Sequence, residues 1–315
     1  MKNIASEDLG FGITCIDTGY ERPGLAACYL IEHQGAAAFI DTGTYYSVPH
    51  LLETLESKGL SPSMVEYVIP THVHLDHAGG AGELMRHCPN ARMVIHPRGA
   101  RHMIDPSRLK AGAMAVYGEA AFKSQLGDLI AVPEDHVIKA PDESRVELNG
   151  RELVFLDTPG HASHHFCIYD PMSEGLFTGD TFGVAYPELA SANGPYIFPP
   201  TTPVQFDPEA WLASVDRLLS LNPKRMYLTH YGMVTDIKNL ATQLKRRIQE
   251  YADLARSLGA DEAKKNLESR LTERTTREVQ AAGNPLSDEE IGRLINMDMN
   301  LNAQGLGVWL ERLQR

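Results

Sequence analysis

One short stretch of the sequence holds an unusual density of side chains that bind metal ions. In residues 72–77, the run His-Val-His-Leu-Asp-His places three imidazoles and one carboxylate within six positions. Imidazole and carboxylate together suit zinc, iron or manganese, and the run follows an apolar segment typical of a buried strand. Gly79 and Gly80 then supply a tight turn into a helix. A metal site explains this pattern better than a polar loop with solvated histidines.

The spacing within this run divides its side chains into two groups. Alternate side chains of an extended chain point to the same side, so His72 and His74 should project together. The turn that follows can bring Asp76 and His77 back toward a second ion. The run therefore has enough ligands for more than one metal ion.

Three later segments also end predicted strands in metal-binding residue types. They are Leu156 to His161, which includes Asp157, then Leu176 to Asp180, and Tyr227 to His230. With the first run, four strand ends supply seven candidate ligands: His72, His74, Asp76, His77, His161, Asp180 and His230.

This arrangement resembles the metallo-β-lactamase superfamily, whose members carry a His-x-His-x-Asp-His run followed by a distant His, Asp and His. The match covers roughly residues 12 to 236. The resemblance implies an α/β fold, the αββα sandwich, here with a helical insertion and a C-terminal helical appendage. It further implies one metal ion held by His72, His74 and His161, another held by Asp76, His77 and His230, and Asp180 as the bridge between them.

Such a pair of ions would carry out hydrolysis without a nucleophile from the protein. Two metals about 3.5–4 Å apart can share a hydroxide, lower its pKa and clamp the oxygen that it attacks. Two divalent ions, two aspartates and one hydroxide leave a charge of about +1, which favours an anionic or ester carbonyl oxygen. Asp76 can also orient the hydroxide or accept its proton, which makes Asp76 and Asp180 the candidate catalytic residues. Zinc is the expected metal, with iron or manganese as alternatives.

Two further residues are expected to support the ligands. Asp41 ends a predicted strand, and in the family this aspartate contacts a ligand histidine and orients it. His165 lies four residues after His161, where family members place a second histidine. We interpret His164 as a bystander, whereas His102 could meet the substrate.

The elements that must position these residues are short strands and amphipathic helices. Helical spacing at residues 48–58 and 208–221, the latter opened by Asp207 and Pro208, alternates with the strands and indicates a mixed α/β class. Apolar runs predict strands at Ala26 to Ile31, Ala36 to Ile40, Val65 to Ile69, Arg92 to Ile95, Leu153 to Leu156, Phe166 to Tyr169, Leu176 to Thr178 and Met226 to Thr229.

We expect a catalytic domain at residues 1–236 and a C-terminal helical region at 237–315. Strand patterns stop near residue 236, and Ser287 with Glu290 forms a capping box ahead of a last helix. Residues 98–130 form a predicted helical lid, and the proline- and aromatic-rich segment 185–206 should cover the site. Tyr117, Tyr186, Tyr196 and Phe198 are the candidate lining of a substrate pocket, or else they pack these insertions onto the sandwich.

Composition limits the partners of the protein. The 315 residues carry a formal charge of −12, which disfavours nucleic acid and anionic membranes, and no stretch approaches the ~18 apolar residues of a membrane span. Four widely spaced cysteines fit reduced core thiols. We therefore expect a cytoplasmic protein, possible as a homodimer, whose partner is a small anionic or acyl ester.

The predicted activity is hydrolysis of a thioester, lactone, carboxylic ester or phosphodiester. The sequence after Asp180 departs from that of glyoxalase II, and Tyr186 lies farther from Asp180 than the corresponding tyrosine of acyl-homoserine lactonases. The helical insertion and C-terminus look most like the quinolone-signal response proteins. Two alternatives remain open: a flavodiiron-like redox protein, and a ligand-binding regulator with a largely idle metal site.

Overall fold

The computed structural model describes residues 6–201 and 205–314, and leaves the side chains at positions 116, 117, 121, 260, 261 and 264 outside the description. By its internal contacts the chain divides into two compact units. The first unit comprises residues 1–157, 164–179 and 223–235, and the second comprises 158–163, 180–222 and 236–315. The expected domain boundary at residue 236 stays a prediction.

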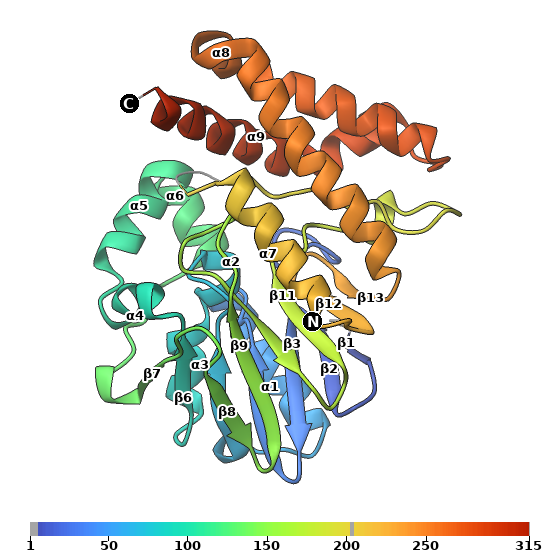
Figure 1. Ribbon diagram of the computed structural model, residues 1–315. Coiled ribbons are helices and arrows are strands. Elements are labelled where there is room, and N and C mark those ends of the chain that lie inside the picture. Colours follow the sequence, from blue (N-terminus) through green and yellow to red (C-terminus); the bar gives the residue numbers. More distant parts are fainter. Residues whose placement is uncertain (1–5, 202–204, 315) are drawn as a thin grey trace. The chain divides into compact units, whose positions relative to one another are not determined.

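The first unit contains a seven-stranded sheet whose strands follow one another in chain order (Figure 1). Strands β1 to β4 pair antiparallel, and β4 to β7 pair parallel. The strands are β1 (Ser6–Asp8), β2 (Ile13–Asp17), β3 (Ala27–His33), β4 (Ala36–Ile40), β5 (Val65–Ile69), β6 (Arg92–Ile95) and β7 (Val137–Lys139).

A second, six-stranded sheet in the same unit has the order β13-β12-β11-β10-β9-β8. Neighbouring strands are antiparallel except β11 and β12, which are parallel. The strands are β8 (Arg145–Leu148), β9 (Arg151–Asp157), β10 (Phe166–Asp170), β11 (Gly175–Gly179), β12 (Arg225–Leu228) and β13 (Gly232–Val234).

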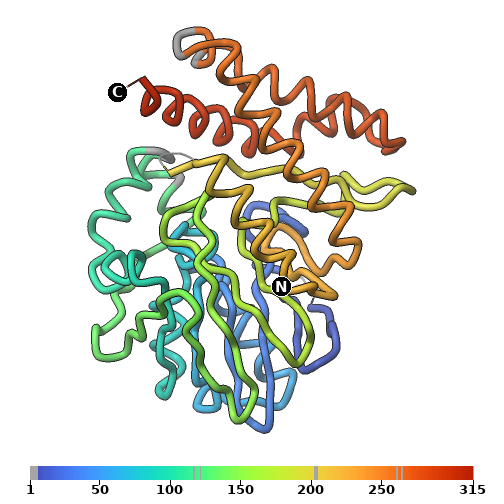
Figure 2. Tube along the Cα trace, in the orientation of Figure 1, coloured from blue at the N-terminus to red at the C-terminus, as the bar shows by residue number. Residues whose placement is uncertain are grey.

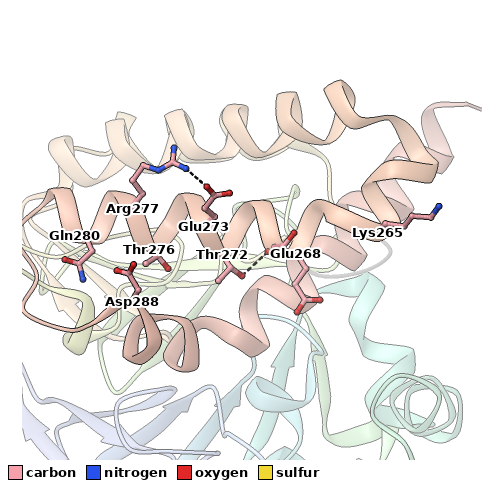
Figure 3. A pocket seen from close by; sticks show the side chains of 9 residues that line it. Lys265, Glu268, Thr272, Glu273, Thr276, Arg277, Gln280 and Asp288 are labelled. Atoms are coloured by element: carbon pink, nitrogen blue, oxygen red, sulfur yellow. Dashed lines mark hydrogen bonds and ion pairs between the residues drawn. The ribbon is translucent and has the colours of Figure 1, made fainter.

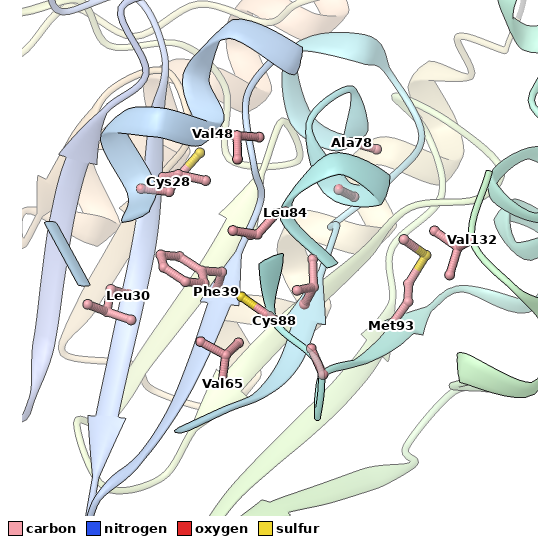
Figure 4. Close-up of a cluster of buried hydrophobic side chains, with 14 of the residues drawn as sticks. Cys28, Leu30, Phe39, Val48, Val65, Ala78, Leu84, Cys88, Met93 and Val132 are labelled. Atoms are coloured by element: carbon pink, nitrogen blue, oxygen red, sulfur yellow. The ribbon is translucent and has the colours of Figure 1, made fainter. Parts of the chain in front are cut away.

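Alternation along the strands builds two hydrophobic layers in the first unit. Leu30 and Phe39 pack under the helices, whereas Tyr29 and Ile40 point toward the second sheet and meet residues such as Phe155. Figure 4 shows the first layer, in which helix side chains face the sheet. Its helices are α1 (Val48–Ser57), α2 (Leu75–Ala78), α3 (Ala81–His87) and α4 (Pro97–Ile104). The layers hold the ends of β5, β11 and β12 in fixed positions.

The expected lid is helical, as predicted. After α4 come α5 (Ser107–Tyr117), α6 (Glu119–Ala121) and the π-helical turn η3 (Phe122–Leu126). Single 3₁₀ turns occur at η1 (Tyr45–Ser47), η2 (Pro62–Met64), η4 (Glu134–His136) and η5 (Pro187–Leu189).

The second unit contains three further helices, α7 (Pro208–Ser220), α8 (Ile237–Ala281) and α9 (Asp288–Leu313). Asp207 caps α7 and Ser287 with Glu290 caps α9, as the sequence predicts. Helix α8 is interrupted at Gly259, whose φ of 70° is left-handed, and the chain changes direction sharply there (Figure 2). In the described part of the chain, every helix is too short or too polar to cross a bilayer.

Candidate metal centre

The histidine-rich run is positioned by the end of β5 and the short helix α2. His74 is extended (ψ 151°) and precedes the first residue of α2, so the chain stays open through His72 and His74 and then turns. The Nε2 atom of His72 lies 2.8 Å from Nδ1 of His74, as the expected projection to one side requires. The turn of α2 brings His77 back, and its ring centroid lies 4.1 Å from that of His72.

Asp76, His77 and His230 come together in the first unit. One ligand atom from each lies within 4.8 Å of the others. The Oδ2 atom of Asp76 is 3.3 Å from Nε2 of His230 and 3.7 Å from Nε2 of His77. Nδ1 of His230 lies 2.8 Å from the backbone oxygen of Leu25, so Nδ1 donates and Nε2 faces Asp76. The sequence does not predict this role of Leu25, because any residue type can provide a backbone carbonyl.

Asp41 contacts His77, one of the candidate ligands. Its side chain is fully buried, and Oδ2 lies 2.7 Å from Nδ1 of His77. Thr229 donates to the same oxygen at 2.7 Å, and the backbone N–H of Thr71 donates to Oδ1 at 2.7 Å. These bonds keep the proton of His77 on Nδ1 and turn Nε2 toward Asp76.

In the second unit, His161 and Asp180 are arranged in the same way as His230 and Asp76 in the first unit. Nε2 of His161 lies 3.2 Å from Oδ2 of Asp180, and Nδ1 lies 2.7 Å from the backbone oxygen of Pro200. The ring of Trp211 packs against His161, with centroids 5.7 Å apart. Gly160 has a φ of 133° and lies so close to Trp211 that a side chain there would collide with it. Packing and one hydrogen bond thus fix the imidazole.

His164 and His165 both lie beside the histidine-rich run. His165 is fully buried, with its ring centroid 4.9 Å from that of His72. The ring of His164 lies 5.8 Å from that of His74 and 6.4 Å from that of His102 on α4. His164 therefore lies between His74 and His102 in a row of imidazole rings. The sequence does not predict this row, because its members are far apart along the chain. Asp157, from another predicted strand end, instead accepts from Nε2 of His96 at 3.1 Å.

The aromatic residues expected to line a substrate pocket have a packing role in the second unit. Tyr186, Tyr196 and Phe198 are each at most 5% exposed. The hydroxyl of Tyr186 donates to Asp298 at 3.0 Å, and that of Tyr196 donates to Glu278 at 3.2 Å. Such burial does not support their assignment to a pocket, which stays a prediction. The side chain of Tyr117 lies outside the described residues.

Open cavities also occur elsewhere in the described residues, and two of them bear on the lid and the C-terminal helices. One of about 570 Å³ lies in the first unit, where Met114 and Phe122 of the lid meet Tyr45 and Tyr46. The other, of about 760 Å³, is a polar groove along α8 in the second unit (Figure 3). Its lining includes Glu268, Thr272 and Arg277 and is charged rather than apolar, unlike most small-molecule sites.

The donor set fits a metal ion. Imidazole nitrogens and carboxylate oxygens at a few ångströms from one another suit zinc, iron or manganese. Burying such electron-pair donors together is costly unless a cation lies among them. The groups of candidate ligands among the described residues consist of histidines and aspartates. Burial raises the pKa of the Cys28 thiol well above its usual value, and the nearby Asp41 raises it further. The four cysteines are buried thiols, as expected.

Comparison with known proteins identifies the family. Residues 22–230 match the model of the metallo-beta-lactamase superfamily, and the chain belongs to that superfamily. It is 28% identical over 250 residues to the metallo-beta-lactamase fold-containing protein ST1585 of Sulfurisphaera tokodaii, covering 76% of this chain and 85% of that one. It is 24% identical over 190 residues to human acyl-coenzyme A thioesterase MBLAC2, covering 56% and 65%. With hydroxyacylglutathione hydrolase of Salmonella gallinarum, 28% identity over 152 residues covers 48% and 45%.

Solved structures agree on the fold. The crystal structure of ST1585 from Sulfolobus tokodaii matches with a TM-score of 0.63 at 23% identity, over 94% of this chain and 98% of that one. The flavodiiron core of Flv1 from Synechocystis matches with a TM-score of 0.53 at 17% identity, over 79% and 61%. At such identities these matches show the fold alone. The predicted fold class, a metallo-β-lactamase sandwich with added helices, is confirmed.

Proposed function

We propose that this protein is a dinuclear metal-dependent hydrolase that cleaves a thioester of a small molecule. The superfamily includes hydrolases, and relatives of this chain are named thioesterase pkgB, acyl-coenzyme A thioesterase and hydroxyacylglutathione hydrolase. Because the chain spans only 34 to 65% of the length of these three, their substrates support the proposal without deciding it. Lactones, carboxylic esters and phosphodiesters belong in the same test.

In the proposed centre, Asp76, His77 and His230 would hold one ion, and His72, His74 and His161 would hold the other. Asp180 would serve both ions. Bound ions of this kind lower the pKa of a coordinated water and polarise the substrate carbonyl.

The residues of the chain orient the ligands and handle protons. Asp41 and the carbonyls of Leu25 and Pro200 keep protons on the Nδ1 atoms of His77, His230 and His161. Each Nε2 lone pair is thereby available to a cation. The carboxylate of Asp76, one-quarter exposed, is the candidate acceptor for a proton released during turnover.

One observation carries the proposal. Two histidines, in different parts of the chain, each have Nδ1 hydrogen-bonded to a backbone carbonyl and Nε2 within 3.3 Å of a carboxylate. A neutral imidazole held this way presents a lone pair, not a proton, toward the carboxylate. A cation between the two resolves the repulsion, as in a metal site.

Metal content and activity test the proposal together. Elemental analysis of the full chain after loading with zinc, iron or manganese should give two ions per chain, and the loaded protein should hydrolyse a thioester. His230→Ala should lower the metal content, whereas His136→Ala, at an exposed histidine, should leave it unchanged. One ion in the wild type with His230 replaceable at no loss would contradict the dinuclear centre. An iron form that consumes oxygen and spares all esters would favour the redox alternative.

A further inference from the structure

The lid carries a local excess of positive charge in an acidic protein. Residues 98–130 contain five cations, Arg98, Arg101, Arg108, Lys110 and Lys123, and three anions, Asp105, Glu119 and Asp128, for a formal charge of +2. The whole chain carries −12. The charge is thus concentrated on α4 and the start of α5, where it creates a field opposite to that of the whole chain.

Two of these arginines, Arg101 and Arg108, act on the side chain of His102. Nε of Arg101 lies 3.3 Å from Nε2 of His102. Burial lowers the pKa of His102, and the charges of Arg101 and Arg108 lower it further. Lys110, by contrast, is ion-paired and lies 2.7 Å from Asp128. We call Arg101, His102 and Arg108 the lid basic cluster.

The carboxylate nearest this cluster has another task. Oδ1 of Asp105 accepts a hydrogen bond from the backbone N–H of Ser107 at the start of α5, at 3.1 Å. Hydrogen bonds to Ser107 lower the pKa of Asp105, and the charge of Arg108 contributes less. Asp105 therefore stabilises the turn between the helices and offsets the field of the arginines only in part.

Direct contacts connect the cluster to the candidate ligands. The ring of His102 lies 6.4 Å from that of His164, which lies 5.8 Å from that of His74. Helix α4 is also seated on the ligand run itself. A Cβ atom at Gly99 would lie 3.0 Å from the side chain of Val73, the residue between His72 and His74. The spacing of the cluster from the ligands is therefore fixed by packing within the first unit.

We propose that the lid basic cluster binds the anionic group of the thiol portion of the substrate, a phosphate or a carboxylate. This inference rests on the proposed thioesterase function. Guanidinium groups pair with both anions through two parallel hydrogen bonds, which a lysine cannot match. A scissile bond at the metal centre would leave the thiol portion extending over α4, past His164 and His102. Nε2 of His102 accepts a hydrogen bond from Arg101, which helps to hold that guanidinium in place while the arginines supply the charge.

Three thioesters with the same acyl group test the assignment. Butyryl-coenzyme A carries phosphates, S-butyrylglutathione carries carboxylates, and butyryl-N-acetylcysteamine carries no charge. The variant Arg101→Ala/Arg108→Ala is compared, in its metal-loaded form, with Arg86→Ala/Arg145→Ala, which removes two exposed arginines elsewhere in the first unit. Loss of charged hydrogen bonds should lower kcat/KM for the recognised anion about 10- to 100-fold, mainly through KM. The neutral thioester should change less than about twofold.

Each outcome has a distinct meaning. A loss confined to the coenzyme A ester identifies phosphate, and a loss confined to the glutathione ester identifies carboxylate. An equal loss for the neutral ester, no loss for any ester, or the same loss in the Arg86/Arg145 control would overturn the assignment. If the wild type hydrolyses none of the three, the proposed thioesterase function fails. Calorimetric binding of coenzyme A and of glutathione then tests the cluster separately, and equal affinity of wild type and variant for both would overturn it.

Discussion

The candidate metal centre and a charged network in the second unit both bury polar side chains, but they satisfy them differently. In the second unit, Nε of Arg247 donates to Glu278 at 2.8 Å, and its Nη1 donates to the backbone oxygen of Ile197 at 2.8 Å. The guanidinium also stacks over Tyr196, 4.1 Å from the ring centroid. Burial raises the pKa of Glu278, but Arg247 and its neighbours outweigh burial and bring the pKa below its usual value.

In the metal centre, by contrast, acceptors face acceptors. Carboxylates of Asp76 and Asp180 face Nε2 atoms whose rings already donate through Nδ1. The network around Arg247 is closed, because its positive and negative groups are paired within the chain. The metal centre is open, because its donor atoms require a cation from outside. Buried polarity therefore indicates function only where the charges fail to balance.

The largest effect is expected from Asp180→Asn in the open site. A neutral amide cannot bridge two cations, so we expect hydrolysis to fall about 10³-fold or more, with the fold intact. Turnover and circular dichroism of the metal-loaded variant check this. Asp216→Asn, an exposed aspartate of the same unit, is the control. Full turnover of Asp180→Asn with two ions bound would show that the bridge is misassigned.

The closed network should respond in stability instead. Arg247→Met removes the main partner of Glu278 and the donor to the backbone oxygen of Ile197, and should cost about 1–3 kcal/mol of the free energy of unfolding. Denaturant titration measures the loss. Arg277→Met, an exposed arginine on the same helix, should change stability little. The folded Arg247→Met variant should keep its normal metal content. Loss of metal without loss of stability would mean that the network around Arg247 serves metal binding and not stability.

Asp41→Asn tests whether a buried carboxylate that contacts a candidate ligand, His77, contributes to metal affinity. Without the charge that holds Nδ1 of His77, metal affinity should fall about 10- to 100-fold. Competition with a chelator measures this affinity. Asp17→Asn changes another buried aspartate at a strand end, one that accepts from Gly19 and Gly24, and should leave the affinity unchanged. Equal affinities for wild type and Asp41→Asn would show that Asp41 does not orient His77 for metal binding.

The sequence predicts the elements that form on local grounds. Strands β5 and β6 have the predicted bounds. Each is a short apolar run, and its own residue pattern is enough to predict a buried strand. Strands β1 and β8 escape detection, since β1 is exposed throughout and β8 largely so, and both depend on their pairing. The reversal of α8 at Gly259 also escapes, because one glycine within a helical pattern does not reveal its conformation.

The same distinction applies to the candidate site. The run from His72 to His77 is visible because its ligands are neighbours in sequence. The contact between His102 and His164 is invisible there, because only the docking of α4 brings them together. The aromatic composition of the segment around Tyr196 does not show whether this residue lines a pocket or packs in a core. Its contacts with Glu278 and Arg247 of α8 appear only in the folded chain.

The smallest effect concerns acid stability of the closed network. The pKa of Glu278 is lower in the folded protein than the ordinary glutamate value of 4.5, so ionised Glu278 stabilises the folded state. This contribution is complete above the unfolded pKa and is lost as pH falls through the folded pKa. Because the side chain is 20% exposed and solvent-screened, the contribution should be about 1 kcal/mol or less.

Unfolding free energies of wild type and Glu278→Gln, measured between pH 3 and 6, isolate this contribution. The amide cannot titrate, so the variant should lose less stability than wild type as the pH falls below about 4.5. Glu273→Gln removes an exposed carboxylate from the same helix and should keep the wild-type slope. Parallel slopes for wild type and Glu278→Gln would mean that the carboxylate is not held by its arginines. The network would then be as unbalanced as the metal centre, and the contrast between the two regions would fail.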